Sequence, residues 1–348
     1  MTPIIDSELL RRLPKAELHC HLDGSVRPET LIELGREYKR AMPRSDADAL
    51  REYMRVDDAR SLEDYLARFD VTLSVLQTED ALERVAYELA MDAARDGVHY
   101  LEIRYSPVLN TREGLELGAA VEAPLRGIER AERDGGAMAR VIVCGLRQMS
   151  PEVSLELAHL AVGYRHRGVV GFDLAGGELG HPASEHAPAF AYARGHDMAC
   201  TCHAGEGADA SYVRDAVHAC GADRIGHATR LFEDESLAQY VNDRRIALEI
   251  CLTSNVQTHA VESYEEHPLR QYYDRGMNVV LNTDNRLMSG TTLTDEYLHA
   301  ARALSFTFDE LCAIALNGFA SAFLPWADRE RLMARATKDI AALRGAQP

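Results

Sequence analysis

The chain has 348 residues, of which 46% are hydrophobic and 27% are charged. Those proportions are typical of a globular protein, and they exclude a disordered chain, a collagen-like repeat and a small disulfide-stapled fold. With 38 basic against 55 acidic residues, the formal net charge is -17. This charge repels nucleic-acid phosphates and anionic lipid surfaces, so we expect neither nucleic acid nor a membrane as a partner.

The cysteines and the opening segment bear on the cellular compartment. The seven cysteines are scattered without a C-x-x-C pair, which favours a reducing compartment over a disulfide framework or a zinc ribbon. The opening segment MTPIIDSELLRRLPKAEL lacks the long apolar stretch of a signal peptide, and no run of ~18 uncharged apolar residues occurs. We therefore expect a cytoplasmic protein. The sequence carries no signal for an oligomeric state.

Eight short segments rich in β-forming residues alternate with stretches of helical periodicity, which predicts βαβ units around a parallel sheet. Eight is the number of strands that closes a (β/α)8 barrel, so we expect an α/β protein of the TIM-barrel class. No internal repeat or low-complexity linker is present, and we expect residues 1–348 to form one domain. The predicted strands are 16–23, 98–106, 140–147, 169–176, 199–206, 224–229, 246–255 and 278–285.

Helical segments are expected at two places outside the regular alternation. After the first strand, Pro28 opens a helix expected over 29–40, and Ser61 with Asp64 has the spacing of a capping box for another. This insertion is a candidate lid over the barrel mouth. After the last strand, the segment LTDEYLHAARALSF and a capping box from Thr307 to Glu310 predict a helical C-terminal tail packed on the barrel.

Histidines and one aspartate mark the carboxyl ends of the predicted strands. His19 and His21 lie two apart in the first strand, so both imidazoles point to one face while the intervening cysteine points to the other. Strands further along end in His203, His227 and Asp284. Barrel enzymes place their active sites at this end of the strands, so we expect these side chains to converge.

Such a set of donors predicts a catalytic metal site. Imidazole nitrogen and carboxylate oxygen suit Zn²⁺, and three or four protein ligands leave a position for water, whose pKa the ion lowers from ~15.7 to about 7. Glu206, in the motif HAGE, is a candidate general acid/base. The three lysines, Lys15, Lys39 and Lys338, do not end any predicted strand, which disfavours a two-metal site bridged by a carbamylated lysine. The H-x-E and P-C-x-x-C signature of the cytidine-type deaminases is absent.

Five ordered motifs, PKAELHCHLDGS, VVGFDLAG, HAGE, RIGHAT and NTDN, resemble those of the adenosine deaminase family of metal-dependent amidohydrolases, over residues 14 to about 290. The resemblance implies a (β/α)8 barrel that removes the 6-amino group of a purine by hydrolysis with one Zn²⁺ per chain. Glu206 would deliver a proton to purine N1, and His227 would orient the zinc-activated hydroxide that attacks C6. The implied metal ligands are His19, His21, His203 and Asp284.

The resemblance also implies how the substrate is held, with His21 beside it. Asp23 matches the acceptor of a hydrogen bond from the ribose 5′-hydroxyl, and because similar adenine deaminases usually carry Glu there, it favours a nucleoside. Gly176 matches the position whose backbone N–H reaches purine N3. Asn285 departs from the family pattern, in which a second aspartate follows the metal-binding one and contacts purine N7. Since an amide donates readily to an unprotonated nitrogen, we expect Asn285 to hold N7.

These features favour an enzyme that converts adenosine, and also 2′-deoxyadenosine, to the inosine form and ammonia. The alternatives are a deaminase of a 5′-modified adenine nucleoside such as aminodeoxyfutalosine, whose carboxylate Arg286 or Arg27 would meet, and a deaminase of free adenine. A non-catalytic binding protein of the same fold is disfavoured by the complete ligand set. We expect Ser254 and Asn255 to close the seventh strand. We assign Cys200 and Cys202 to the core, and the following histidines to packing or solvent: His99, His159, His166, His181, His186, His196, His218, His259, His267 and His299.

Overall fold

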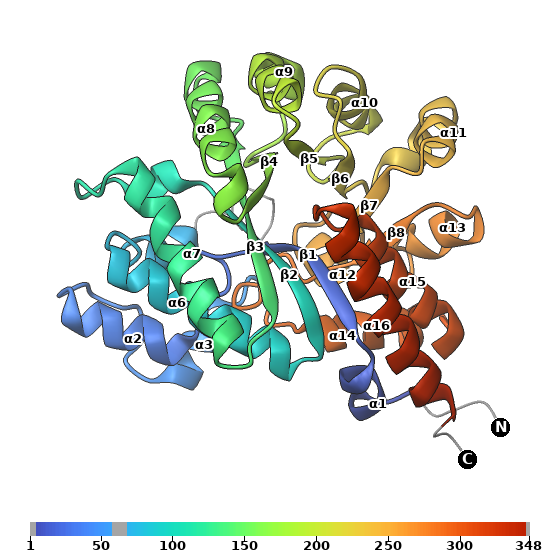
Figure 1. Cartoon of the computed structure of the whole chain (residues 1–348), viewed down its shortest axis with the longest axis horizontal. Helices are drawn as coiled ribbons and strands as arrows, with labels where there is room; N and C mark the ends of the chain where they lie inside the picture. Colours follow the sequence, from blue (N-terminus) through green and yellow to red (C-terminus); the bar gives the residue numbers. More distant parts are fainter. Residues whose placement is uncertain (1–4, 58–67, 346–348) are drawn as a thin grey trace.

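The computed structural model describes residues 5–57 and 68–345. Eight parallel strands run in chain order around a barrel, and helices surround them (Figure 1). The predicted barrel is therefore confirmed, with each strand near its predicted position. The strands are β1 (Lys15–His21), β2 (Val98–Tyr105), β3 (Met138–Leu146), β4 (Val169–Ala175), β5 (Ala199–Ala204), β6 (Arg224–His227), β7 (Ala247–Ile250) and β8 (Val279–Leu281).

Amphipathic helices cover the outside of the barrel because parallel strands joined by right-handed crossovers bury both faces of the sheet. The helices that connect successive strands after β2 carry their buried residues toward the sheet. They are α7 (Leu117–Arg133), α8 (Pro151–Gly163), α9 (Ala187–Gly195), α10 (Ala210–His218), α11 (Glu235–Asp243), α12 (Leu252–Gln257) and α13 (Leu269–Asp274), with short 3₁₀ turns η1 (Pro107–Asn110), η2 (Arg165–Arg167), η3 (Ala183–His186) and η4 (Leu231–Glu233).

Helices also fill the two predicted additions to the barrel. Between β1 and β2 lie α2 (Pro28–Glu37), α3 (Ala47–Met54), α5 (Phe69–Leu73) and α6 (Glu79–Arg95). Pro28 occupies the first turn of α2 as predicted, whereas the expected capping box of Ser61 and Asp64 lies outside the described residues. The short α1 (Ser7–Arg12) precedes β1. The chain continues after the barrel with α14 (Leu293–Ala303), α15 (Phe308–Ser321) and α16 (Trp326–Gly345).

The C-terminal tail packs on the barrel as predicted. The Thr307 side chain accepts from the backbone N–H of Glu310, and the Glu310 carboxylate accepts from the backbone N–H of Thr307, so the capping box of α15 is present. Residues of α15 lie against β1 and β8. A Cβ on Gly318 would lie 3.1 Å from the carbonyl oxygen of Ala16, so the absence of a side chain allows this close approach.

The barrel closes at a seam between the first and last strands. The side-chain oxygen of Asn282 accepts hydrogen bonds from the backbone N–H groups of Leu18 (2.7 Å) and His19 (3.1 Å). Further along, the backbone N–H of His21 donates to the carbonyl of Asp284 (2.7 Å), and the N–H of Asp284 donates to the carbonyl of His19 (3.0 Å). The seam therefore brings Asp284 beside two histidines that lie some 265 residues earlier in the sequence.

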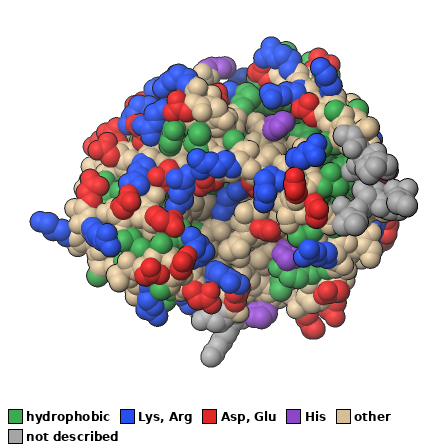
Figure 2. Space-filling view, turned by 90° about the horizontal axis from the view of Figure 1, so that it is seen from below, with side chains coloured by type: hydrophobic (Ala, Val, Ile, Leu, Met, Phe, Trp, Pro, Cys, Tyr) green, Lys and Arg blue, Asp and Glu red, His purple; other side chains and the backbone are tan. Residues whose placement is uncertain are grey.

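The surface charge and the helix lengths bear on whether the protein binds nucleic acid or a membrane. On the face that Figure 2 shows, basic and acidic side chains are interspersed rather than gathered into single-sign patches. Within residues 5–57 and 68–345, every helix is too short or too polar to traverse a lipid bilayer.

Candidate active site

Four donor side chains converge at the carboxyl ends of the strands. His19 and His21 come from β1, His203 from β5 and Asp284 from the segment after β8, and one donor atom of each lies within 4.8 Å of the others. The Nε2 atoms of His21 and His203 are 3.1 Å apart, and Asp284 Oδ1 is 3.3 Å from Nε2 of both His19 and His21. The structure therefore brings together all four residues that the sequence predicted as metal ligands.

Buried carboxylates behind the cluster orient its imidazoles. His19 Nδ1 lies 2.9 Å from Glu249 Oε2, and His203 Nδ1 lies 3.1 Å from Asp173 Oδ2. When Nδ1–H donates to a carboxylate, the neutral ring turns the Nε2 lone pair toward the centre of the cluster. Asp284 is fixed in the same way, because its Oδ2 accepts from Ser254 Oγ at 2.7 Å.

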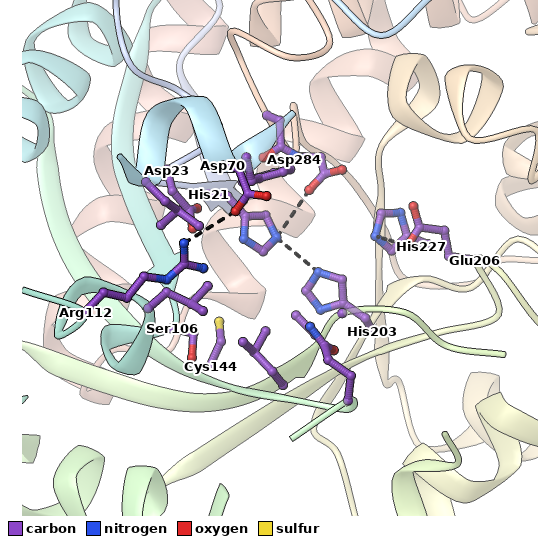
Figure 3. Close-up of a pocket in the computed structure, with 18 residues that line it drawn as sticks. His21, Asp23, Asp70, Ser106, Arg112, Cys144, His203, Glu206, His227 and Asp284 are labelled. Carbon is purple, nitrogen blue, oxygen red and sulfur yellow. Dashed lines mark hydrogen bonds and ion pairs between the residues drawn. The ribbon is translucent and has the colours of Figure 1, made fainter. Parts of the chain in front are cut away.

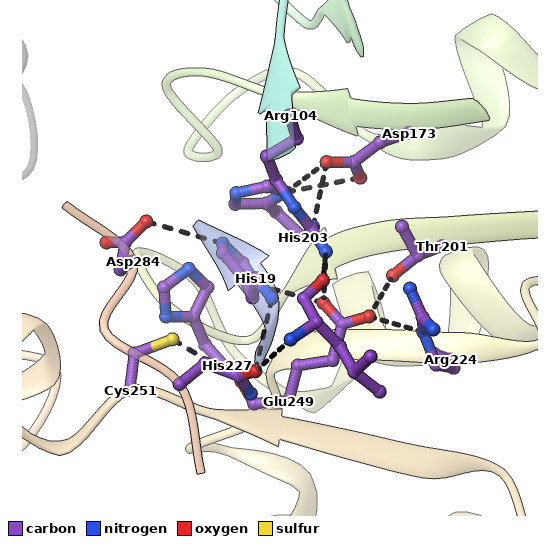
Figure 4. A network of polar contacts seen from close by, with 12 residues as sticks. His19, Arg104, Asp173, Thr201, His203, Arg224, His227, Glu249, Cys251 and Asp284 are labelled. Atoms are coloured by element: carbon purple, nitrogen blue, oxygen red, sulfur yellow. Dashed lines mark hydrogen bonds and ion pairs between the residues drawn. The ribbon is translucent and has the colours of Figure 1, made fainter. Parts of the chain in front are cut away.

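The orienting carboxylates belong to a buried ionic network inside the barrel (Figure 4). Arg104 donates to Asp173 at 3.0 Å and to Glu249 at 2.9 Å, and Arg224 donates to Glu249 at 2.7 Å. Burial alone would raise the pKa of Glu249, but these two guanidinium groups hold that pKa below its usual range. Glu249 therefore stays an anion that can accept from His19. A charged residue in a short buried strand is the sequence signal that could have revealed this role.

The cluster fits a divalent cation. Burial lowers the pKa of His21 and of His203, so both imidazoles are neutral and each can offer a lone pair. Burial would raise the pKa of Asp284, but the neighbouring histidines keep that pKa well below its usual range. Three imidazole nitrogens with one carboxylate oxygen form a donor set typical of a catalytic zinc or similar ion, and His19, His203 and Asp284 are each oriented by a further polar contact outside the cluster.

Glu206 lies beside the cluster in a tight turn after β5. Its side chain is 8% exposed, and its Oε2 is 3.5 Å from His227 Nε2. The turn is pinned by Glu178, whose carboxylate accepts from four consecutive backbone N–H groups at 2.7 to 3.0 Å. Burial, Asp284 and Glu178 raise the pKa of Glu206 well above its usual value. The sequence had singled out Glu206 but not its anchor Glu178, which stands in the motif DLAGGE.

His227 ends β6 with its ring directed at the same cavity. His227 and Asp284 have φ angles of 64° and 61°, in the left-handed region that side chains other than glycine rarely adopt, and such strain is concentrated at functional sites. Asn255 Nδ2 lies 2.9 Å from His227 Nδ1. The prediction that Ser254 and Asn255 close the seventh strand is therefore wrong. The chain leaves β7 at Ile250 and turns into α12, which points both side chains at the site.

A cavity of about 200 Å³ adjoins the cluster. Figure 3 shows Glu206 and His227 at one end and Asp23 at the other, with His21 and His203 between them. All of the predicted catalytic and substrate-binding residues line the cavity, which places these side chains within reach of one ligand: His21, Asp23, Gly176, Glu206, His227 and Asn285.

Two glycines make room for the residues on the substrate side of the cavity. Gly176 has a φ of 96°, and a Cβ there would lie 2.2 Å from the side-chain oxygen of Gln148. A Cβ on Gly24 would lie 1.7 Å from Asn285 Oδ1, so this glycine makes room for the Asn285 side chain. The Oδ1 atom of Asp23 is buried without a hydrogen-bond partner, and burial raises the pKa of Asp23 to about 7.

Two arginines do not lie where the sequence suggested. Arg286 is almost completely buried and pairs with Glu17, and Arg27 donates to Asp92 at 2.6 and 2.7 Å. Neither lines the cavity, so the expectation that they meet a carboxylate on a larger substrate is wrong. The cationic side chain at the cavity is instead Arg112, which the sequence analysis missed and which lies 3.4 Å from Asp70 (Figure 3).

The chain matches known proteins over almost its whole length. A family model described as adenosine deaminase matches residues 14–339. Adenosine deaminase 1 of Streptomyces coelicolor is 43% identical, over 92% of this chain and 85% of the relative. A probable adenosine deaminase of Dictyostelium discoideum is 43% identical over 92% of this chain, which spans only 42% of that longer relative.

Solved structures of deaminases and amidohydrolases are also similar to this chain over almost its whole length. An adenine deaminase from Arthrobacter aurescens superposes with a TM-score of 0.88 at 28% identity, over 94% of this chain and 99% of the other. An amidohydrolase from Burkholderia ambifaria with bound zinc superposes with a TM-score of 0.88 at 25% identity, over 99% of this chain and 95% of the other.

Proposed function

The chain belongs to the adenosine deaminase family, and we propose that it catalyses the hydrolytic deamination of adenosine, and of 2′-deoxyadenosine, to the inosine form and ammonia. The observation that carries this proposal is the position of Glu206, a buried carboxyl group with a raised pKa beside a four-donor metal cluster and inside a small cavity. A proton donor next to an activated water is what the departure of an aromatic amine requires.

The residues that would hold the metal are His19, His21, His203 and Asp284, with one Zn²⁺ per chain. Their nitrogen and oxygen donors favour Zn²⁺ over Mg²⁺ or Ca²⁺. When bound, the ion supplies Lewis-acid chemistry that makes hydroxide available near neutral pH.

Glu206 serves as the proton donor to purine N1. Because burial and the neighbouring carboxylates of Asp284 and Glu178 raise its pKa well above the usual value, the carboxyl group keeps its proton to higher pH than an exposed glutamate and can deliver it to the ring nitrogen. Protonation of N1 withdraws electrons from C6 and makes that carbon electrophilic. His227 Nε2, 3.5 Å from Glu206, and Asp284 flank the approach of water to C6, where they orient its attack.

The proton balance follows from these positions. The water oxygen bonds to C6 as the Glu206 proton moves to N1. One proton of that water returns to Glu206, and the other goes to the 6-amino group, which leaves as ammonia when its bond to C6 breaks. The product keeps a proton on N1 and a carbonyl oxygen at C6, as inosine does.

The opposite side of the cavity recognises the rest of the nucleoside. Asp23 accepts from the ribose 5′-hydroxyl, Gly176 offers its backbone N–H to N3, and Asn285 holds N7. His21, the member of the metal cluster nearest to Asp23 in sequence, also lines the cavity and contacts the substrate from there. A nucleoside with a free 5′-hydroxyl suits this end of the cavity, since the buried Oδ1 atom of Asp23 has no other hydrogen-bond partner in the described part of the chain. The partner is thus a small-molecule purine nucleoside, and nucleic acid and membranes play no part.

The seven buried thiols support a cytoplasmic location. All seven cysteines are free, and free thiols persist in reducing compartments.

A substrate panel tests the proposed function. Ammonia release is measured with adenosine, 2′-deoxyadenosine, aminodeoxyfutalosine and adenine, beside the Glu206→Gln variant and an exposed control, Glu185→Gln. We expect kcat/KM to be highest for the two unmodified nucleosides. Glu206→Gln should lower kcat by ~100-fold or more at unchanged metal content, whereas the control should match the wild type. A preference for adenine or aminodeoxyfutalosine, or comparable turnover in Glu206→Gln, would contradict the proposal.

A further inference from the structure

A chain of polar contacts leads away from His227 on the side opposite the cavity. Asn255 Nδ2 lies 2.9 Å from His227 Nδ1, and Asn255 Oδ1 lies 3.1 Å from His267 Nε2. The chain ends where the backbone N–H of Leu269 donates to His267 Nδ1 at 3.1 Å. The three side chains are at most 3% exposed, so water does not compete for these contacts.

The hydrogen bond from the Leu269 N–H to His267 Nδ1 determines which atom donates and which accepts in each of the other contacts. A backbone N–H can only donate, so His267 Nδ1 must be an acceptor. His267 is a neutral imidazole, since burial lowers its pKa to about 3, and a neutral ring whose Nδ1 accepts carries its proton on Nε2. That proton points at Asn255, so the atom facing it is the amide oxygen.

The orientation of the Asn255 amide in turn determines the tautomer of His227. With its oxygen turned to His267, the amide of Asn255 presents its NH₂ group to His227 Nδ1. Because that group only donates, His227 Nδ1 must accept, and the proton of a neutral His227 ring must lie on Nε2. Nε2 is the nitrogen that faces Glu206 at 3.5 Å.

We propose that Asn255 and His267 are positioning residues that hold His227 in the tautomer with its proton on Nε2. This inference rests on the proposed function, because that proton is what lets His227 donate a hydrogen bond into the cavity, toward the oxygen that attacks C6 or toward Glu206. The other tautomer would present a lone pair there and could not stabilise the oxygen as it gains negative charge.

The source of the direction is a backbone N–H group, which does not titrate and can only donate. Leu269 is the first residue of α13 and follows Pro268, which has no N–H of its own. The N–H of Leu269 is therefore an unsatisfied donor of the first helical turn, and His267 is its acceptor. The short motif H-P-L thus sets the state of a histidine forty residues earlier in the chain.

The direct test reads the tautomer itself. Metal-loaded protein without substrate, labelled with ¹⁵N in its histidine rings, gives long-range ¹H–¹⁵N spectra in which protonated and unprotonated ring nitrogens differ, and the resonances of His227 are identified by their loss in His227→Gln. We expect Nε2 to be protonated in the wild type and Nδ1 in Asn255→Asp, whose carboxylate can only accept. A wild-type His227 protonated on Nδ1 would overturn the proposal, whatever purine the enzyme prefers.

Kinetics of matched variants separate positioning from stability. His267→Leu should lower kcat by about 10- to 100-fold with KM and metal content nearly unchanged. His267→Gln, whose amide can still donate to Asn255, should restore most of the rate. The control is His186→Leu, which removes another buried histidine with polar contacts, to Ser154 and the Arg147 carbonyl. We expect a lower Tm in this control at unchanged kcat.

Two kinetic outcomes would overturn the proposal. One is an unchanged kcat in both His267→Leu and Asn255→Asp. The other is an equal loss of kcat in His267→Leu, His267→Gln and His186→Leu, which would indicate a merely structural role. If His267→Leu fails to fold, the wild-type spectrum and the Asn255→Asp variant still test the proposed tautomer. If the tautomer is as expected but adenosine is not turned over, the positioning inference survives and the proposed substrate fails.

Discussion

Several side chains at the barrel mouth use one polar atom for an orienting contact and the other for the metal cluster or the cavity. His19 turns Nδ1 to Glu249 and Nε2 to the metal cluster, and Asp284 turns Oδ2 to Ser254 and Oδ1 to the same cluster. His227 does the same with Asn255 and the cavity. In each case the outer contact removes the rotational and tautomeric freedom that the inner atom would otherwise have. Substituting an outer partner therefore changes the chemistry of a residue that remains in place.

Asn285 lines the cavity and is the residue expected to contact purine N7. If it donates to purine N7, Asn285→Ala should lower kcat/KM for adenosine by roughly 10-fold, the effect of about 1.4 kcal/mol lost from one hydrogen bond. The matched control is 7-deazaadenosine, which has no N7 and should lose nothing further in the variant. A change below about twofold with adenosine, or an equal loss with both substrates, would remove Asn285 from this role.

The elements set the depth at which each side chain lies. β6 and β7 have four residues each and β8 has three, so the chain leaves the barrel early, and residues at or shortly after the ends of β6 and β8 line the cavity. The left-handed backbone positions are the last residue of β6, His227, and Asp284, three residues after the end of β8. Rigid strands hold these strained positions in place, which is where barrel enzymes acquire their reactive groups.

The capping box of α15 gives a prediction at the scale of an element. Thr307→Ala removes the side chain that accepts from the Glu310 N–H, so the free energy of unfolding should fall by about 1 kcal/mol, as measured by urea denaturation. Thr307→Ser keeps the hydroxyl group and should keep the stability. Equal losses in the two variants would show that the methyl group, and not the cap, stabilises the end of this helix.

At the scale of the whole molecule, the metal cluster connects parts of the chain that are far apart in sequence. Its ligands come from β1, from β5 and from the segment after β8, so a bound ion would tie the barrel together across its mouth. Because an ion that binds only the folded state stabilises that state by mass action, the effect should be visible in thermal unfolding.

Removal of the metal by a chelator should lower Tm and abolish ammonia release together. At a free ion concentration 100 times Kd the stabilisation is about 2.7 kcal/mol. We expect Zn²⁺ to restore both properties and Mg²⁺, which prefers oxygen ligands, to restore neither. His203→Ala serves as the control, since its Tm should no longer respond to chelation. An unchanged Tm in protein that metal analysis shows to be free of zinc would contradict this expectation.

Prediction from sequence succeeded where a local rule applied. The alternation of strands and helices predicted the barrel, and the rule that parallel strands present their carboxyl ends together predicted the convergence of His19, His203 and Asp284. The single-domain organisation of residues 1–348 stays a prediction, as do the substrate contacts of Asp23 and Gly176.

Prediction failed where the result depended on which strands face each other across the barrel. The contact of His19 with Glu249 joins residues 230 positions apart, and no local pattern reports such a pair. Arg286 was misjudged for a related reason, because the left-handed turn at Asp284 redirects the chain and points the guanidinium group at Glu17. His267 was assigned to packing or solvent and is indeed buried, but no local pattern indicated that both of its ring nitrogens are hydrogen-bonded.

The seam at Asn282 has a consequence for biosynthesis. One edge of β1 acquires its partner only when residues 282–284 are available, so the strand made first on the ribosome waits unpaired on that side until most of the polypeptide has been translated. The same timing governs the ion, because Asp284 is the last ligand to emerge. Capture of an ion by the full set of ligands would thus be a late event, reserved for chains whose synthesis is nearly complete.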